Sequence, residues 1–279
     1  MRPFFYETDT RICDDTIGGT FIWRDYFNTR FVISDGVLYM EVDYPDGTTA
    51  FTYPAGGADD SLYAVRDYCS AKGIPLIFCM VTPQETEVLQ RVFGELDIKH
   101  ERDWYDYLYD AQQMKELSGR KFSAVRNHIN KFKNQNTNWS FEKITPENIK
   151  EACDFINEHS FDSNKGASSF EEGERKNIEV LENYELYGMV GGILKVGDKI
   201  VGLSIGEIVR DTLFVHIEKA DRNIPGAYQM LMNKFALEYA QGPVRYINRE
   251  DDAGDEGLRK SKLAYQPISL LEKYTVRVV

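Results

Sequence analysis

MVGGILKVGDKIVGLSIGEI, residues 189–208, is the stretch of this sequence that most clearly indicates its fold. Apolar residues dominate both arms of the stretch, residues 189–196 and 199–208, and Gly197-Asp198 between the arms is typical of a two-residue turn. We therefore predict an antiparallel β-hairpin. The segments on either side of it extend this prediction through the second half of the chain.

The residues that flank the hairpin predict an alternation of strands and helices. Thr145-Pro146-Glu147 has the N-cap residue followed by proline with which many helices begin, and Pro267 ends the last predicted helix. The other predicted elements are strands at residues 139–144, 213–220, 244–248 and 268–274, and helices at residues 145–160, 170–183, 224–240 and 255–266. The predicted order is β-α-α-β-β-β-α-β-α-β.

The first half of the chain predicts a small sheet followed by alternating helices and strands. Asp35-Gly36 and Asp46-Gly47 are turn signals between strand-like runs, and Gly73 ends a helical pattern. The predicted elements are strands at residues 30–34, 37–43, 48–53, 74–81 and 104–109, and helices at residues 59–72, from Thr82-Pro83 onward, and at 111–136. The whole chain is therefore of the α/β class.

The composition is that of a globular protein, with 279 residues of which 42% are hydrophobic and 28% charged. The longest apolar run, residues 74–81, is far shorter than the roughly 20 residues that a membrane span requires. We find no apolar signal region at the N-terminus and no CxxC pair among the four cysteines. These observations favour a cytoplasmic protein with reduced thiols and no integral membrane segment.

The distribution of charge is uneven along the chain. A formal net charge of −12 disfavours unspecific binding to nucleic acid, and we expect no DNA partner. Residues 111–136, by contrast, carry six Lys or Arg residues and one acidic residue. Helical spacing places Arg120, Asn127 and Lys131 opposite an apolar stripe in this segment. That basic face is either a solvated surface or a binding surface for an anionic group.

Two ionisable residues lie on the predicted strand at residues 213–220. Strand alternation puts His216 and Glu218 on one face and Lys219 on the other. Buried charge is unfavourable unless it is paired, so the two residues are candidates for proton transfer. The alternative is a hydrogen-bonded core histidine beside a structural ion pair.

The segment at residues 248–262 leaves a predicted strand and enters a predicted helix. Asp252 or Asp255 can cap that helix without having any other function. Capping does not explain Arg249 and Glu250, nor the basic residues that follow on the helix. Arginine and lysine at such a position can hold a phosphate or a carboxylate, so we predict a ligand site here.

Three further patterns concern a glycine-containing junction, a hydrolase-like motif and the spacing of the histidines. Residues 222–227, with Gly226, lie at a strand-to-helix junction that can either present N–H groups to a pyrophosphate or serve as a tight turn, although Pro225 supplies no N–H group. Residues 202–206 match the hydrolase pattern G-x-S-x-G, but strand residues continue after them, so we predict no nucleophilic Ser204. The histidine spacings predict no metal site.

Three segments resemble a bacterial family of uncharacterised proteins that share the C-terminal catalytic domain of phosphatidylglycerol lysyltransferases. The segments are SGRK (118–121) with RNHIN (126–130), HIEKA (216–220) with GAYQ (226–229), and NREDDAGDEGLRK (248–260). The order of elements likewise resembles the GNAT acyltransferase fold. The resemblance implies two tandem GNAT-like units: a degenerate one at residues 1–136, which includes the basic linking helix 111–136, and a second one at residues 137–279.

The resemblance further implies an acyltransferase that moves an aminoacyl group from a charged tRNA to a small amine, a hydroxyl compound or a lipid headgroup. We expect no required cofactor, since the donor is a co-substrate. One alternative is a GNAT N-acyltransferase that uses acyl-CoA. The other is a GNAT-like module that binds an amino acid or an anionic ligand without turnover.

Under the aminoacyl hypothesis the residues fall into three groups. Glu218 or His216 would assist proton transfer. The residues that would hold the substrate or its phosphates are Lys219, Gly226, Ala227, Tyr228, Asn248, Arg249, Glu250, Asp252, Arg259 and Lys262. The residues that would contact tRNA are Arg120, Lys121, Arg126, Asn127 and Lys131.

Overall fold

The computed structural model describes residues 1–160 and 176–279, which form two compact units. The first unit comprises residues 1–106, 251–254 and 270–279, and the second comprises residues 107–250 and 255–269. This division differs from the expected boundary between residues 136 and 137. Two short segments from the end of the chain belong to the first unit, which the order of predicted elements did not indicate.

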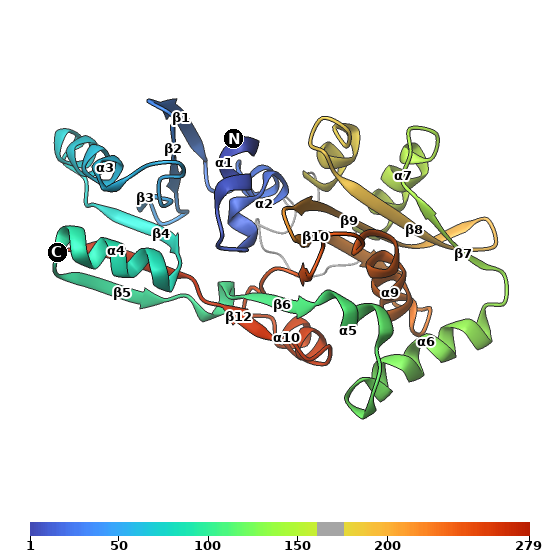
Figure 1. The fold of residues 1–279 in the computed structure, drawn as a ribbon. Helices are drawn as coiled ribbons and strands as arrows, with labels where there is room; N and C mark the ends of the chain where they lie inside the picture. Colours follow the sequence, from blue (N-terminus) through green and yellow to red (C-terminus); the bar gives the residue numbers. More distant parts are fainter. Residues whose placement is uncertain (161–175) are drawn as a thin grey trace. The chain divides into compact units, whose positions relative to one another are not determined.

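The first unit is built on a six-stranded sheet with the strand order β1-β2-β3-β4-β13-β5. Its last strand, β13, lies between β4 and β5 and is antiparallel to both (Figure 1). The C-terminus of the chain therefore completes a sheet that the N-terminal half begins. The strands are β1 (Arg30–Ser34), β2 (Val37–Asp43), β3 (Thr49–Phe51), β4 (Ile77–Val81), β5 (Leu96–His100) and β13 (Tyr274–Val278).

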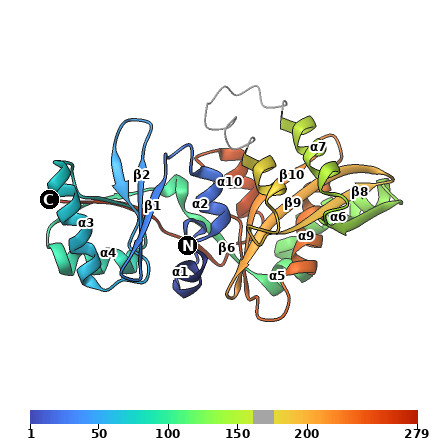
Figure 2. The ribbon, with the colours of Figure 1, turned by 90° about the horizontal axis from the view of Figure 1, so that it is seen from above.

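Two helices of the first unit, α3 (Asp59–Lys72) and α4 (Pro83–Phe93), pack side by side on this sheet (Figure 2). Leu62 and Leu89 bring the two helices onto a core that includes Phe78. Gly73 ends α3 in the left-handed conformation, with φ 66°, as predicted. The remaining helical segments are α1 (Arg2–Glu7), α2 (Ile17–Trp23) and the 3₁₀ turns Cys13–Asp15 and Arg102–Trp104.

The second unit is built on a seven-stranded sheet with the order β12-β6-β11-β10-β9-β8-β7. The predicted hairpin is confirmed as β8 and β9, joined by a turn in which Gly197 has φ 60°. β10 pairs with β9 antiparallel and with β11 parallel. The strands are β6 (Asp106–Asp110), β7 (Trp139–Lys143), β8 (Val190–Val196), β9 (Lys199–Val209), β10 (Thr212–Ala220), β11 (Tyr246–Asn248) and β12 (Ser269–Leu271).

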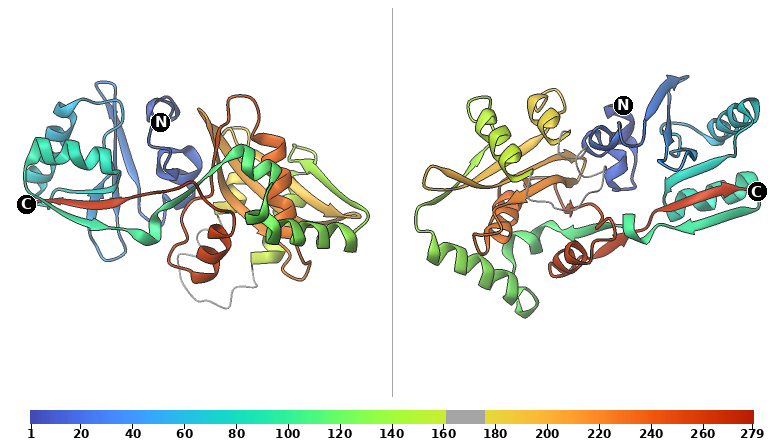
Figure 3. Two further views of the ribbon diagram at one scale, coloured as in Figure 1. Left: turned by 60° about the horizontal axis from the view of Figure 1, so that its bottom comes forward. Right: turned by 180° about the vertical axis from the view of Figure 1, so that it is seen from behind.

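Helices cover both faces of the sheet of the second unit. α7 lies on one face, and α6 and α9 lie on the other (Figure 1 and Figure 3). Among the described residues, no helix has the length and apolar character needed to span a bilayer. The helices are α5 (Ala111–Glu116), the 3₁₀ turn Arg120–Phe122, α6 (Ser123–Gln135), α7 (Ile149–Ser160), α9 (Ala227–Tyr239) and α10 (Glu256–Leu263), and residues 176–182 are also helical.

Several predicted elements were wrong. The single helix at residues 111–136 is broken after α5, because Leu117 and Gly119 have φ values of 49° and 81°. The final strand at 268–274 is instead two strands, β12 and β13, in different sheets. Helices α1 and α2 and strand β5 were not predicted. The first residues of the helix predicted at 170–183 lie outside the described residues.

A buried lysine links three distant parts of the chain within the first unit. The side chain of Lys273, directly before β13, is 1% exposed. Its Nζ lies 2.5 Å from Asp14 Oδ2 and 2.8 Å from Asp106 Oδ1. Burial by itself would lower the pKa of Lys273, but the carboxylates of Asp106 and Asp14 raise it well above its usual value. The lysine therefore stays charged and holds the N-terminal segment, the start of β6 and β13 together.

Replacing this lysine tests that link. The substitution Lys273→Met leaves two carboxylates without their cation, and we expect it to lower the free energy of unfolding by about 3 kcal/mol or more. The measurement is urea denaturation followed by circular dichroism. Lys99→Met is the matched control, since Lys99 is 74% exposed and pairs with Glu101 at the surface. An unaltered midpoint for Lys273→Met would contradict the role given to this ion pair.

Candidate functional site

The candidate site of the second unit is built around a bulge in β10. The register between β10 and β9 shifts between Val215 and Ile217, so that His216 is an extra residue in the strand. The sequence alternation did not predict this bulge, and the predicted common face of His216 and Glu218 is wrong: Glu218 is paired with Ser204, whereas His216 contacts Glu207, which is on the other face of β9. The rings of Phe214 and His216 are nearly parallel, with centroids 6.4 Å apart. A bulge beside a site is a common means of redirecting a side chain, and here it turns His216 into the protein.

His216 is held between two carboxylates. Its side chain is 0% exposed, its Nδ1 lies 2.7 Å from Glu250 Oε1, and its Nε2 lies 3.0 Å from Glu207 Oε1. Burial by itself would lower the pKa of His216, but the hydrogen bonds to Glu207 and Glu250 raise it to about 9. At neutral pH both ring nitrogens are therefore protonated and donate. An imidazolium held in this way cannot accept a proton from a substrate.

A tight turn after β11 sets the position of Glu250. Asn248 is fully buried, and its side-chain oxygen accepts a hydrogen bond from the backbone N–H of Glu250 at 2.6 Å. Glu250 takes the left-handed conformation, with φ 55°. Its carbonyl oxygen accepts from the N–H of Tyr107 on β6 at 3.1 Å. The predicted residues Asn248 and Glu250 thus have a structural role, which is to aim a carboxylate at His216.

Arg249, between these two residues, forms a buried ion pair with Glu218. Its Nη2 lies 3.0 Å and 3.1 Å from the two carboxylate oxygens of Glu218. The side chains are 9% and 13% exposed. Burial by itself would lower the pKa of Arg249, but Glu218 raises it. The sequence predicted Glu218 as a proton-transfer residue and Arg249 as a ligand residue, without predicting that they are partners.

Two tyrosine rings flank the guanidinium of Arg249. Its central carbon lies 4.7 Å from the ring centroid of Tyr265 and 5.9 Å from that of Tyr109. The Tyr109 hydroxyl donates to the carbonyl oxygen of Lys262 at 2.9 Å, and Lys262 Nζ donates to the carbonyl oxygen of Arg249 at 2.5 Å. α10 is therefore fixed to β6 and to the residues after β11, and Arg249 has little freedom to move.

Two buried polar atoms beside this ion pair lack a hydrogen-bond partner. Among the described residues of the second unit they are Ser204 Oγ and Arg249 Nη1. Ser204 is directly opposite Glu218 in the pairing of β9 with β10, so the two side chains share a face of the sheet. Unsatisfied buried donors are unfavourable in a folded protein. The neighbourhood of Glu218 therefore contains buried hydrogen-bonding groups that the described residues leave unused.

The strand-to-helix junction at Gly226 is a close packing contact. Gly226 has φ 83°, and a Cβ atom at this position would lie 2.1 Å from the carbonyl oxygen of His128 on α6. The N–H of Ala227 already donates to Ile224 at 3.2 Å. The turn interpretation of this glycine therefore explains the geometry. Ala227 is buried and Tyr228 is half-buried on α9.

Other predicted ligand residues are distributed over both units. Asp252 belongs to the first unit, where its carboxylate lies 3.4 Å from Arg102. Asp255 caps α10 by accepting from the N–H of Leu258 at 2.8 Å. Arg259 is half-buried on α10. Lys219 lies on the opposite face of β10 from Glu218, as predicted.

The predicted tRNA-binding residues are exposed to different degrees. Arg126 is half-buried and donates through Nη1 to the carbonyl oxygens of Leu117 and Gly119, which closes the break before α6. Lys121 donates to Gln113. The remaining members of the group are exposed, namely Arg120, Asn127 and Lys131. Lys121 is exposed as well, so Arg126 is the one predicted contact residue that is partly buried.

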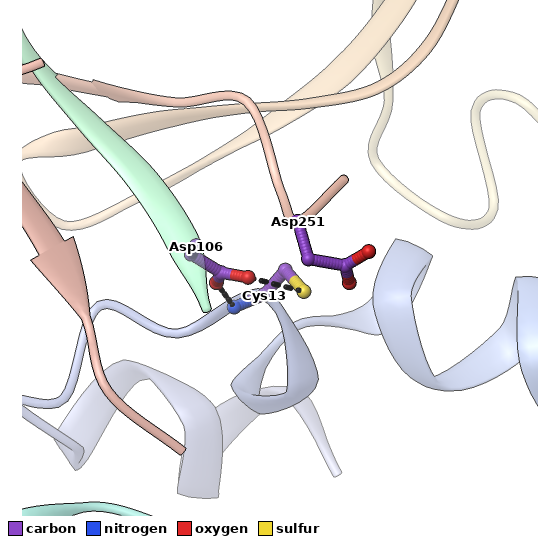
Figure 4. A group of neighbouring side chains, drawn as sticks. All are labelled: Cys13, Asp106 and Asp251. Atoms are coloured by element: carbon purple, nitrogen blue, oxygen red, sulfur yellow. Dashed lines mark hydrogen bonds between the residues drawn. The ribbon is translucent and has the colours of Figure 1, made fainter. Parts of the chain in front are cut away.

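A second cluster of reactive side chains lies in the first unit. Cys13, Asp106 and Asp251 each offer one potential metal-ligand atom, all within 4.8 Å of one another. Hydrogen bonds join Cys13 to Asp106 (Figure 4). Lys273 Nζ also lies 3.3 Å from Cys13 Sγ and 2.8 Å from Asp106 Oδ1. Because the ammonium group of Lys273 already compensates the negative charge of this cluster, we interpret the cluster as an ion-pair network.

Glu207 and Tyr109 were missed as site residues. Glu207 is the single acidic residue in the mostly apolar strand β9, which is a signal that a buried partner exists elsewhere. Tyr109 lies in a strand rich in tyrosine, which the sequence alone does not distinguish from an ordinary core strand. Ser204 was correctly excluded as the nucleophile of a hydrolase elbow, because β9 continues through it to Val209.

Comparisons with known proteins match nearly the whole chain. A family model described as "Phosphatidylglycerol lysyltransferase, C-terminal" matches residues 6–277. A conserved protein of unknown function from Bacteroides thetaiotaomicron VPI-5482 is 32% identical, with a TM-score of 0.91 over 100% of this chain and 95% of that one. A relative from Mycoplasmoides gallisepticum, an uncharacterized protein, is 24% identical over 192 residues. That match covers 66% of this chain and 59% of the relative, less than two thirds of its length.

More distant structures bear on the fold alone. L-PGS from Bacillus licheniformis has a TM-score of 0.67 at 15% identity, over 99% of this chain and 90% of that chain. FemX has a TM-score of 0.60 at 11% identity, over 100% of this chain and 95% of that chain. Together with the two mixed sheets, these likenesses confirm the predicted α/β fold of tandem GNAT-like units.

The protonation of His216 gives a direct test of the site geometry. We expect its ring to stay doubly protonated at pH 7 and to titrate near pH 9. Because the pKa is raised on folding, the stability from this pairing is present below the unfolded pKa of about 6.5 and is lost as the pH rises through 9. Imidazole nitrogen shifts in NMR spectra measure the titration. Glu207→Gln should lower the midpoint of the His216 titration. A neutral His216 ring at pH 7 in the unaltered protein would contradict the pairing of His216 with Glu207 and Glu250.

Proposed function

This chain belongs to the family of phosphatidylglycerol lysyltransferase C-terminal domains, and from that premise we propose that it transfers an aminoacyl group from a charged tRNA to an acceptor with an amine or a hydroxyl group. The observation that carries the proposal is the buried Arg249–Glu218 pair, in which Nη2 of the guanidinium binds the carboxylate and Nη1 has no partner among the described residues. The pair offers a fixed donor and a fixed carboxylate side by side.

This arrangement is complementary to an aminoacyl ester. The acceptor attacks the ester carbonyl carbon, the new acyl bond forms, and the bond to the ribose oxygen of the tRNA breaks. The carbonyl oxygen gains negative charge in this step, and Arg249 Nη1 is the donor that would stabilise it. The proton lost by the acceptor ends on the ribose oxygen. Glu218 would relay that proton or hold the α-ammonium group of the donor.

His216 has a positioning role in this proposal. Its two nitrogens are both engaged with carboxylates, so we assign proton transfer to Glu218 in preference to His216. The imidazolium holds Glu250, and the backbone of Glu250 is bonded to β6. This keeps the residues after β11, including Arg249, in one conformation. Such support around a reacting group limits reorganisation during the reaction.

The exposed basic residues Arg120 and Lys131 would contact the phosphates of the tRNA. Both lie in the segment that has the largest local excess of positive charge in an otherwise acidic chain. A small basic surface favours one oriented encounter over general binding to nucleic acid. Asn127 on the same exposed side can donate to a phosphate or sugar oxygen.

Acyl-CoA is a less favoured donor. Pro225 has no N–H group, the N–H of Ala227 is used within the turn, and Gly226 packs against the backbone of α6. The junction before α9 therefore offers few free N–H groups to a pyrophosphate. We propose no resident cofactor. The proposal defines the acceptor by its nucleophilic group, an amine or a hydroxyl. The acceptor is a lipid headgroup or a small molecule.

A transfer assay tests the proposed function. The assay combines purified protein with a pool of radiolabelled aminoacyl-tRNAs and with a bacterial extract separated into lipid and aqueous fractions. It follows the label into each fraction. We expect a new labelled product whose formation depends on the protein. Arg249→Lys keeps the charge but removes the planar fork and should lower the rate about 100-fold or more.

Arg245→Lys is the matched control for that variant, because Arg245 is exposed just before β11. It should leave the rate unaltered. Label that stays on tRNA in every fraction would contradict aminoacyl transfer. Ligand binding that Glu218→Gln weakens, with no turnover in any fraction, would instead favour a binding module.

Salt dependence tests the tRNA contacts separately. The double variant Arg120→Gln and Lys131→Gln should weaken tRNA binding and reduce the slope of log affinity against log salt by about 2, one for each lost phosphate contact. Fluorescence anisotropy with labelled tRNA measures the slope. Lys150→Gln with Lys199→Gln removes the same charge from exposed positions outside the basic segment. Equal slopes for the two double variants would contradict the proposed contact surface.

A further inference from the structure

One edge of the six-stranded sheet of the first unit exposes an apolar strand. β1 is the terminal strand of that sheet, and among the described strands it pairs only with β2. All five of its residues are exposed. Three consecutive ones are large and apolar: Phe31 is 55% exposed, Val32 58% and Ile33 48%. An exposed apolar edge strand is a template for pairing with another strand, and proteins ordinarily protect such edges.

The opposite edge of the same sheet shows what a protected edge looks like. β5 has the sequence LDIKH, in which Asp97, Lys99 and His100 interrupt the apolar residues. Its one exposed large apolar residue is Ile98, at 37%. Charged residues keep such an edge solvated. β1 has no charged residue between Arg30 and Ser34, so this edge lacks the charges that protect the β5 edge.

The turn that follows β1 determines which backbone groups face the open edge. Asp35 and Gly36 both have positive φ, 50° and 77°, in a two-residue hairpin turn. The residues beside such a turn, Ser34 and Val37, exchange hydrogen bonds, and hydrogen-bonded pairs then alternate along the strand. The N–H and C=O groups of Phe31 and Ile33 therefore point away from β2 and toward the open edge.

We propose that β1 pairs antiparallel with β1 of a second copy of this chain, in the register centred on Val32. In this register Phe31 lies opposite Ile33 of the second copy, and Val32 lies opposite itself on the two-fold axis. The outward-pointing N–H and C=O groups of Phe31 in one copy then face those of Ile33 in the other copy, so both Phe31–Ile33 pairs can form backbone hydrogen bonds. The two six-stranded sheets then become one continuous sheet.

The side chains of β1 are compatible with this self-pairing. Phe31 and Ile33 are on one face of the sheet and Val32 is on the other, so apolar residues meet apolar residues on both faces. Arg30 lies opposite Ser34 of the second copy, so no like charges face each other. Within its own chain Arg30 is already compensated by Glu41 and by Asp43, whose carboxylate is 2.9 Å away.

Sedimentation of the full chain at increasing concentration tests the proposal. Pairing through one strand buries little area, so we expect a reversible dimer that appears in the micromolar range, with twice the monomer mass of 32.2 kDa. Val32→Lys places two like charges on the two-fold axis and should weaken the dimer about tenfold or more. Ile98→Lys on the opposite edge is the matched control and should have no effect. A monomer at all concentrations, which would leave the edge to another protein or a lipid surface, would overturn the proposal.

A disulfide tests the register. Val32→Cys puts two thiols at a non-hydrogen-bonded pair, where Cα atoms of antiparallel strands are about 4.5 Å apart and a disulfide can form. The background is Cys153→Ser, because Cys153 is the native cysteine that is not fully buried. Oxidation should give a covalent dimer for Val32→Cys and not for Ile98→Cys. Equal cross-linking of the two variants would contradict the proposed pairing.

Discussion

A buried charge must be enclosed by opposite charge, and this constraint organises both units of the protein. In the second unit Glu207 and Glu250 enclose His216, and Glu218 neutralises Arg249. In the first unit, carboxylates do the same for Lys273. The partners come from distant parts of the chain, so each pair also fixes where those parts lie within their unit. Removing one partner leaves an uncompensated charge in a low-dielectric interior.

The sequence predicted much of the fold because local signals agreed with the final structure. The hairpin turn at Gly197 and the helix at residues 59–72, ended by Gly73, depend on neighbouring residues and were confirmed. The insertion of β13 between β4 and β5 depends on pairing across more than 170 residues, which no local pattern reveals. The break at Leu117 was missed because a left-handed leucine is rare.

The candidate site was predicted as a set of residues but not as an arrangement. Ionisable residues in apolar strands identified His216 and Glu218, and the charged segment after β11 identified Arg249 and Glu250. Which residues pair was set by the bulge in β10 and the turn at Glu250, and neither has a clear sequence signal. The arrangement changes the chemistry, because it turns the predicted base His216 into a fixed cation. Glu218, beside an arginine whose Nη1 has no partner in the described part of the chain, is then the better candidate for handling a proton.

The central claim of this account is that Arg249 Nη1 is the donor for the carbonyl oxygen of an aminoacyl group. A crystal structure of the protein with a non-hydrolysable aminoacyl-adenosine amide tests it most directly. The account predicts that the amide oxygen lies within hydrogen-bond distance of Arg249 Nη1, with the amino acid next to Glu218. An analogue bound elsewhere in the second unit, with Nη1 still unpartnered, would contradict the claim.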